Sequence, residues 1–170
     1  MSMLIDAYRF GGGGGGGVWV PSASFTPGGT SAGWNGYTLR VRIPSSAISQ
    51  YGSKCRLTLS SSGLVIAGAY FQEAGTTVDF ASTPAQVMFG GVGTYSGAGT
   101  TTDEILVPIS PGKSYVASFY FNGATSIDTN TSVTTWLQAY KSGSDAASIT
   151  ASGYSSSAQA SLVTLLEVFQ

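Results

Sequence analysis

The run of residues 114–121, SYVASFYF, constrains the fold more than any other part of the sequence. Successive side chains of a strand point to opposite faces, so the large odd-numbered residues of this run share one face. The apolar run 105–109 comes before it, and Pro111 and Gly112 stand between the two. Because proline fixes its own φ and glycine accepts a positive φ, this pair predicts a turn. We therefore expect a β-hairpin near the centre of a sheet, with the rest of the chain stacked around it as further strands.

Two more runs alternate in the same way. Residues 37–43 turn their aromatic and aliphatic side chains to one face, which we expect to point inward, and Arg40 and Arg42 to the other, which we expect to point outward. Residues 55–60 place Cys55 and two leucines inward. The pattern therefore predicts that Cys55 is a buried small hydrophobe.

The rest of the chain continues this β-rich character. Further strands are predicted at 4–10, 64–73, 76–80, 85–89, 132–140 and 160–169, a tight turn at 34–36, and loops at 21–36, 90–102, 122–131 and 142–157. Gly68, in the middle of 64–73, indicates a bulge. The leucine spacing in 160–169 also fits a helix, so the pattern alone leaves both structures open there. Roughly nine to eleven strands with almost no helix predict an all-β fold, an antiparallel β-sandwich.

Several of these segments resemble a known family. Gly90-Gly91, Asp103 and the run 107–120, VPISPGKSYVASFY, look like the β-sandwich domain that precedes the catalytic domain in some SGNH (GDSL-type) esterases. TLRVRI at 38–43, GSKCRLTLSSSG at 52–63 and ASLVTLLEVF at 160–169 resemble strands of the same domain. The resemblance implies a jelly-roll-like sandwich that is an accessory module and not the enzyme itself. It also favours a strand for 160–169.

Catalytic residues are missing from the sequence. The esterases that the chain resembles carry a Gly-Asp-Ser motif and a late Asp-x-x-His, and neither is present. Histidine is absent, so the usual base that activates a serine is also absent. Zinc ligands are lacking, although loop oxygens around Asp128 leave calcium as an alternative. We expect a protein that is not an enzyme and has no cofactor.

The charge content limits the partners. Charged residues are 9% of the chain and the formal net charge is −1. The seven basic side chains are scattered, so nucleic acid is not an expected partner. No run approaches the length of a membrane span, and Asp6 and Arg9 interrupt any secretory signal. A neutral surface without an export signal favours an assembled structure, and we expect a virion protein made in the host cytoplasm.

The N-terminal region predicts an attachment device. Seven glycines occupy residues 11–17. A flexible linker is the alternative, but ordering such a segment is costly and favours close approach to another chain. We therefore divide the chain into an arm, 1–20, and a sandwich domain, 21–170. The expected apolar anchors of the arm are Leu4, Tyr8, Phe10 and Trp19.

Aromatic residues in or beside loops are candidates for glycan binding, because aromatic faces stack on sugar rings. The candidates are Trp34, Tyr51, Tyr95 and Tyr154. Such residues also cap sandwich cores or form subunit contacts. The expected function is a non-enzymatic structural protein of a phage or phage-like particle, as a decoration, spike or fibre component. Its expected partners are copies of itself, other virion proteins and host-surface glycans. A stand-alone carbohydrate-binding module is the alternative.

Overall fold

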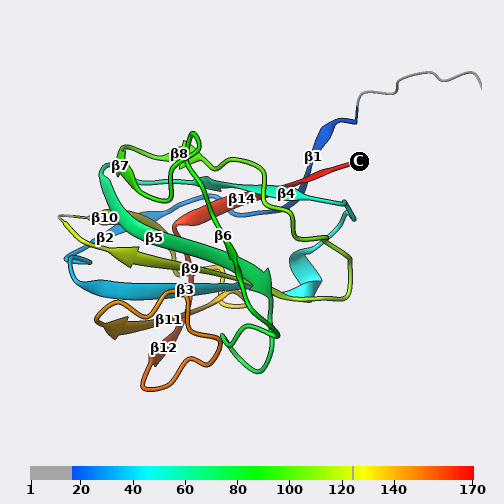
Figure 1. Cartoon of the computed structure of the whole chain (residues 1–170). Helices are drawn as coiled ribbons and strands as arrows, with labels where there is room; N and C mark the ends of the chain where they lie inside the picture. The colour runs from blue at the N-terminus through cyan, green and yellow to red at the C-terminus, as the bar shows by residue number, and fades with distance from the viewer. Residues whose placement is uncertain (1–16, 124) are drawn as a thin grey trace, which may run out of the picture.

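The computed structural model of the chain describes residues 17–123 and 125–170. These residues form an all-β structure in which every strand pairing is antiparallel (Figure 1). The strands are β1 (Trp19–Ser24), β2 (Gly29–Ala32), β3 (Tyr37–Ile43), β4 (Cys55–Leu59), β5 (Leu64–Glu73), β6 (Ala85–Gln86), β7 (Tyr95–Gly97), β8 (Thr100–Thr101), β9 (Tyr115–Phe121), β10 (Ser126–Asn130), β11 (Leu137–Ser142), β12 (Ser155–Ala158), β13 (Ala160–Ser161) and β14 (Val163–Phe169). Within the described ranges the one helical element is the 3-10 turn η1 (Ser45–Ala47).

The strands are arranged in three sheets. The largest has the order β12-β11-β3-β9-β5-β6, with β7 also paired to β5. A second has the order β1-β14-β4-β8, and a small third sheet has the order β13-β10-β2. This arrangement confirms the predicted antiparallel β-sandwich. The jelly-roll-like connectivity stays a prediction, and residues 1–16, which include the strand predicted at 4–10, lie outside the described residues.

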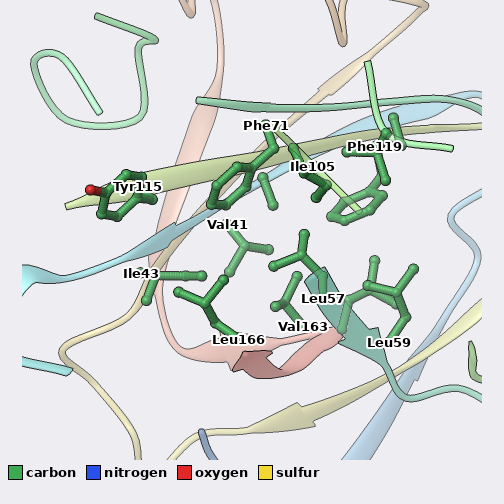
Figure 2. Packing of buried hydrophobic residues seen from close by; sticks show 14 of the residues in the cluster. Val41, Ile43, Leu57, Leu59, Phe71, Ile105, Tyr115, Phe119, Val163 and Leu166 are labelled. Atoms are coloured by element: carbon green, nitrogen blue, oxygen red, sulfur yellow. The ribbon is translucent and has the colours of Figure 1, made fainter. Parts of the chain in front are cut away.

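The core fills the space between the two larger sheets (Figure 2). Val41, Phe71 and Phe119 come from the large sheet, and Leu57 and Leu166 come from the four-stranded sheet. All five side chains are fully buried. Fully burying an aliphatic or aromatic side chain contributes about 1.5–3 kcal/mol, so this double layer holds the sandwich together.

The predicted strand at 114–121 is confirmed as β9, which begins one residue later, and it lies between β3 and β5. Gly112 has a φ of +86°, as the predicted turn requires. The predicted hairpin, however, is wrong. Ile105 exchanges backbone hydrogen bonds of 2.7 and 3.0 Å with Cys55, and Ile109 exchanges bonds of 2.9 and 3.0 Å with Gly52.

The run 105–109 therefore lies along the four-stranded sheet, not along β9. Its alternate residues, Ile105, Val107 and Ile109, are buried in the core, and Pro108 has no N–H with which to continue a ladder. The turn after it carries the chain from one layer to the other. The Tyr115 hydroxyl holds this crossing in place: it donates to the Pro108 carbonyl at 3.1 Å and accepts from the Ser110 N–H at 2.9 Å.

Several predicted loops contain strands. The loop predicted at 122–131 contains β10, the end of 142–157 contains β12, and 90–102 contains β7 and β8. These strands consist mostly of Ser, Thr, Asn and Gly, and their pairing with distant segments gives no local signal. Conversely, the strand predicted at 85–89 shortens to β6, 76–80 is reduced to an Ala74–Phe80 bridge, and 132–140 begins later, as β11.

Two backbone irregularities interrupt the regular strands. The register of β5 shifts between Ile66 and Gly68, which confirms the predicted bulge. The final run is a strand and not a helix, but it is broken at Leu162, whose φ is +61°. On one side of this residue β13 pairs with β10, and on the other β14 pairs with β4 and β1. Leu162 thus joins the small third sheet to the four-stranded sheet.

The motif Gly90-Gly91…Asp103 has a structural role. The Asp103 carboxylate accepts hydrogen bonds from the N–H of Gly90 at 2.9 Å and from the N–H of Gly91 at 2.6 Å. Both glycines have a positive φ. A charged acceptor binding two successive backbone donors fixes this turn at the start of the 90–102 segment.

Arg40 does not have the solvent exposure that the alternation suggests. It lies on the outer face of β3, yet its exposed fraction is 0%. The guanidinium donates to the carbonyls of Val78 at 3.1 Å and Asp145 at 3.3 Å, and also to those of Ile149 and Ser148. Segments 76–80 and 142–154 therefore fold over this part of the large sheet and bury the arginine.

The two ends of the described chain meet in the four-stranded sheet. Val18 and Gln170 exchange backbone hydrogen bonds of 3.0 and 3.1 Å, and Trp19 pairs with Phe169. Within residues 17–123 and 125–170, the first strand of the sandwich is thus β1, which starts just before the boundary predicted at residue 21. In Figure 1, the start of β1 and the C-terminus lie together at the upper right, whereas β2 and β10 lie at the opposite, left-hand end.

Candidate ligand-binding hollow

A hollow of about 360 Å³ opens at the β2 end of the sandwich. Three aromatic residues line it: Trp34, Tyr37 and Tyr140. The other lining residues are small or neutral, namely Ser31, Ala32, Gly33, Gln138 and Ser157. Its size falls within the range of small-molecule sites, and its lining combines aromatic area with a few neutral polar groups.

The three rings pack edge to face. The Trp34 ring centroid lies 5.8 Å from that of Tyr140 and 6.4 Å from that of Tyr37, at interplanar angles of 88° and 78°. Trp34 is only 8% exposed, and its other neighbour is Phe121 at 6.3 Å. Tyr37 and Tyr140 are each 36% exposed. The tyrosines therefore present the accessible aromatic surface, and the tryptophan supports them from below.

A tight turn and one strand pairing place these rings. The turn predicted at 34–36 is present, with positive φ at Gly33 (+89°) and Gly36 (+77°) and a 3.1 Å bond from the Tyr37 N–H to the Trp34 carbonyl. In the β3–β11 register, Tyr140 pairs with Leu39 and Ser142 pairs with Tyr37. Residues diagonal to each other across two strands share a face. Tyr37 and Tyr140 are such a pair, with ring centroids 6.5 Å apart.

The polar groups of the hollow are neutral and fixed. The Gln138 side-chain oxygen accepts from the Ser161 hydroxyl at 2.5 Å, and Gln138 is almost fully buried. The Ser31 hydroxyl accepts from the Trp34 indole N–H at 3.2 Å. Because no charged residue lines the hollow, it suits an uncharged ligand with hydroxyl groups.

The four predicted glycan-binding aromatics do not come together. Trp34 alone lies in this hollow. Tyr154 covers Arg40, with the guanidinium carbon 5.0 Å from its ring centroid, and burial raises the pKa of its phenol. Tyr95 packs on Phe89 at 5.3 Å, and its hydroxyl donates to the Ala98 carbonyl at 2.9 Å.

Tyr51 is 68% exposed and lies at the other end of the molecule, where its carbonyl accepts from the Gln170 side chain at 3.1 Å. Tyr37 and Tyr140 line the hollow but are not among the predicted site residues. The alternation correctly assigns Tyr37 to the inner face of its strand, but the sequence does not reveal that this face stays open at the end of the sandwich. The signal that could have indicated the hollow is a tyrosine directly after the turn at 34–36.

Of the four predicted anchors of the arm, the structure describes only Trp19. Its ring packs against Phe169 at 5.3 Å, and the Arg56 guanidinium carbon lies 4.6 Å from its centroid. Trp19 thus packs on the outer face of its own four-stranded sheet. Leu4, Tyr8 and Phe10 lie outside the described residues.

The described residues offer no cluster of three or more acidic, histidine or cysteine side chains that could hold a metal ion. Asp128, the predicted alternative for calcium, lies in β10 and not in a loop, and its carboxylate accepts from the Ser60 hydroxyl. Cys55 is buried as predicted, and burial raises the pKa of its thiol, so the thiol is poorly reactive. Over the same described ranges, no helix has the length and apolar character needed to cross a membrane.

Comparison with known proteins gives no relative: neither the scan against protein-family models nor the search of curated proteins finds a match to this chain.

Proposed function

We propose that this chain is a non-enzymatic structural component of a phage or phage-like particle and that it contacts host glycans through the hollow lined by Tyr37 and Tyr140. The observation that carries the glycan contact is the combination of exposed tyrosine rings with exclusively uncharged polar neighbours. Sugars present C–H groups on one face of the ring, which stack on aromatic side chains, and hydroxyls at the rim, which pair with neutral donors and acceptors. Tyrosine supplies both kinds of contact, since its ring is apolar and its hydroxyl is polar.

The position of the hollow supports the particle role. The start of β1 and the C-terminus lie at one end of the sandwich, and β2, whose residues Ser31 and Ala32 line the hollow, lies at the other (Figure 1). A chain attached through its N-terminal region therefore directs the hollow away from the attachment point. The low charge content of 9% also suits a protein held in a fixed assembly, which does not depend on surface charge to stay apart from its copies.

The glycan contact is tested by replacing both tyrosines. Tyr37→Ala/Tyr140→Ala removes the accessible rings, and we expect the affinity for a glycan identified on a glycan array to fall at least about tenfold, equivalent to about 1.4 kcal/mol. Titration calorimetry measures the affinity. Tyr51→Ala is the matched control, because Tyr51 is more exposed than either tyrosine but lies at the other end. Equal affinities for the folded double variant and the wild type would contradict the contact.

The particle role is tested by deleting residues 1–17. The next residue, Val18, already pairs with Gln170 in the sandwich. We expect the truncated protein to fold, because β1 remains complete, and to lose incorporation into particles. Circular dichroism checks the fold, and the stoichiometry of purified particles checks incorporation. Full occupancy by the truncated protein would contradict the arm. Retained glycan binding together with no particle association for the whole chain would favour the stand-alone carbohydrate-binding module.

A further inference from the structure

We propose, on the basis of the function proposed above, that the ligand is a neutral oligosaccharide that continues from the aromatic hollow into a second hollow beside it. The second hollow has a volume of about 370 Å³. Ala32 and Gly33 line both hollows, so the two are adjacent along the turn that follows β2. One sugar ring occupies the tyrosine side, and the following rings occupy the other side.

No large side chain separates the two hollows at residues 32–33. Ala32 has the smallest side chain after glycine and is exposed, and a Cβ placed on Gly33 meets no atom within 4 Å. The space above this turn is therefore open. A ligand that leaves the first hollow can pass over residues 32–33 without moving any side chain.

The second hollow is built on a firmly held backbone. The Ser126 backbone N–H donates to the Gly63 carbonyl at 3.0 Å. The Ser61 hydroxyl accepts from the Gly63 N–H at 3.0 Å and donates to the Ser126 carbonyl. The Thr125 hydroxyl accepts from the Val65 N–H at 3.3 Å. These bonds join the start of β5 to the start of β10. The floor of the second hollow is thus fixed before a ligand binds, which lowers the ordering cost of binding.

Two polar side chains in this hollow are available to a ligand. Asn35 and Ser62 line it and are both exposed. Because both side chains are exposed, their polar groups can reach a ligand. An amide supplies two donors and an acceptor, and a hydroxyl supplies one donor and two acceptors, which matches the hydroxyl groups of a sugar. The two hollows therefore differ: the first offers ring faces, and the second offers hydrogen bonds.

The ligand is uncharged because neither hollow has a charged lining residue. An acidic sugar would place its carboxylate where no lining cation compensates for lost hydration. A neutral hexose chain meets no such cost. This chemistry favours neutral polysaccharide segments over sialylated or uronic acid-containing ones.

The test is a length series measured by titration calorimetry. The probes are neutral oligosaccharides of one to six units derived from cellulose, starch and chitin, with an oligogalacturonate series as the acidic comparison. We expect at least one neutral series to gain about tenfold or more in affinity between one and four units. In the variant Asn35→Ala/Ser62→Ala, we expect the affinity for the longer chains to fall to that for the short ones. The affinity for the shortest ligand that binds should stay unchanged.

The outcomes separate the two proposals. Equal affinity at all lengths, an equal loss at all lengths in Asn35→Ala/Ser62→Ala, or tighter binding of the acidic series overturns the extended neutral ligand. In those cases the tyrosine contact stands as long as Tyr37→Ala/Tyr140→Ala still lowers affinity. If no neutral chain binds the wild type, the extended neutral ligand is overturned. If the array also yields no glycan, the glycan contact fails with it.

Discussion

Arg40 and Arg56 have the same sequence setting and opposite surroundings. Each is the outward member of an alternating strand, Arg40 in β3 of the large sheet and Arg56 in β4 of the four-stranded sheet. Arg56 makes a paired contact with the Glu167 carboxylate, at 2.8 and 3.1 Å, and its side chain is 32% exposed. Arg40 is fully buried, and its partners are backbone carbonyls of distant loops.

The difference arises from the residues opposite each arginine. Glu167 pairs with Arg56 in the β14–β4 register, so the charge partner lies on the neighbouring strand. Arg40 lies between Ser118 and Ala139, and neither residue can neutralise a guanidinium. Loops must then supply the acceptors. Alternation in a sequence therefore predicts the face of a sheet on which a side chain lies, but not whether that face is exposed.

The arginine surroundings predict unequal losses of stability. Arg40→Ala leaves one buried carbonyl and three partly buried ones without their donor and removes the cation between Phe80 and Tyr154, so we expect the free energy of unfolding to fall by about 3–5 kcal/mol. Arg56→Ala breaks a partly exposed ion pair and should cost about 1 kcal/mol or less. Urea denaturation measures both. Equal losses in the two variants would mean that the contacts of Arg40 with the covering loops stabilise the fold no more than the partly exposed ion pair of Arg56 does.

A smaller expected effect concerns how the free energy of unfolding changes at acid pH. Burial opposes ionisation of Asp145, but hydrogen bonds from Ser148 and Lys141 and the positive charges of Lys141 and Arg40 outweigh it, so the pKa of this carboxyl is lowered. A lowered folded-state pKa contributes stability that is present above the ordinary value of 3.8 and is lost as the pH falls through the folded value. Asp145→Asn should therefore be less stable than the wild type at pH 7, by about 1 kcal/mol or less.

The same variant gives a second readout. The difference in unfolding free energy between Asp145→Asn and the wild type should shrink as the pH falls below 4, because the wild-type carboxyl becomes protonated there. Urea denaturation from pH 2 to 7 follows it. Asp103→Asn is the variant with which Asp145→Asn is compared, because the Asp103 carboxylate accepts hydrogen bonds from the turn at 90–91 and not from the loops around Arg40. A difference for Asp145→Asn that stays constant across this range would contradict the ion-pair account.

The sequence predicted the parts of the fold that local alternation determines. Both bounds of β3 are as predicted, β9 differs by one residue at its start and β4 by one residue at its end, because the alternation of side chains is clear in each strand. The strands β10 and β12 were missed, because serine and threonine give little signal and the pairing partners are remote in sequence. The partner of the run 105–109 was wrong for a related reason: a turn predicts a reversal but not the layer to which the chain returns.

Less of the candidate site than of the fold was predicted from the sequence. Trp34 was named, since an aromatic residue among glycines stands out, but it lies beneath the tyrosines and is nearly buried. Tyr140 joins Tyr37 only through the β3–β11 register, and that register depends on the whole large sheet. The residues near Tyr37 or Tyr140 in the sequence therefore do not predict that the two rings meet.

The position of β14 has a consequence for how the chain folds during synthesis. β14 lies between β1 and β4, so until β14 has been made β1 has no partner strand in this sheet and β4 lacks its partner on one side. β1 ends at Ser24 and β14 begins at Val163, and at roughly 5–20 residues per second translation separates them by on the order of ten seconds. During that interval the ribosome-bound chain exposes unpaired strand edges, which are sites for association with other chains. Folding of the four-stranded sheet is thus a late event, and long-range pairing of this kind is slow once it begins.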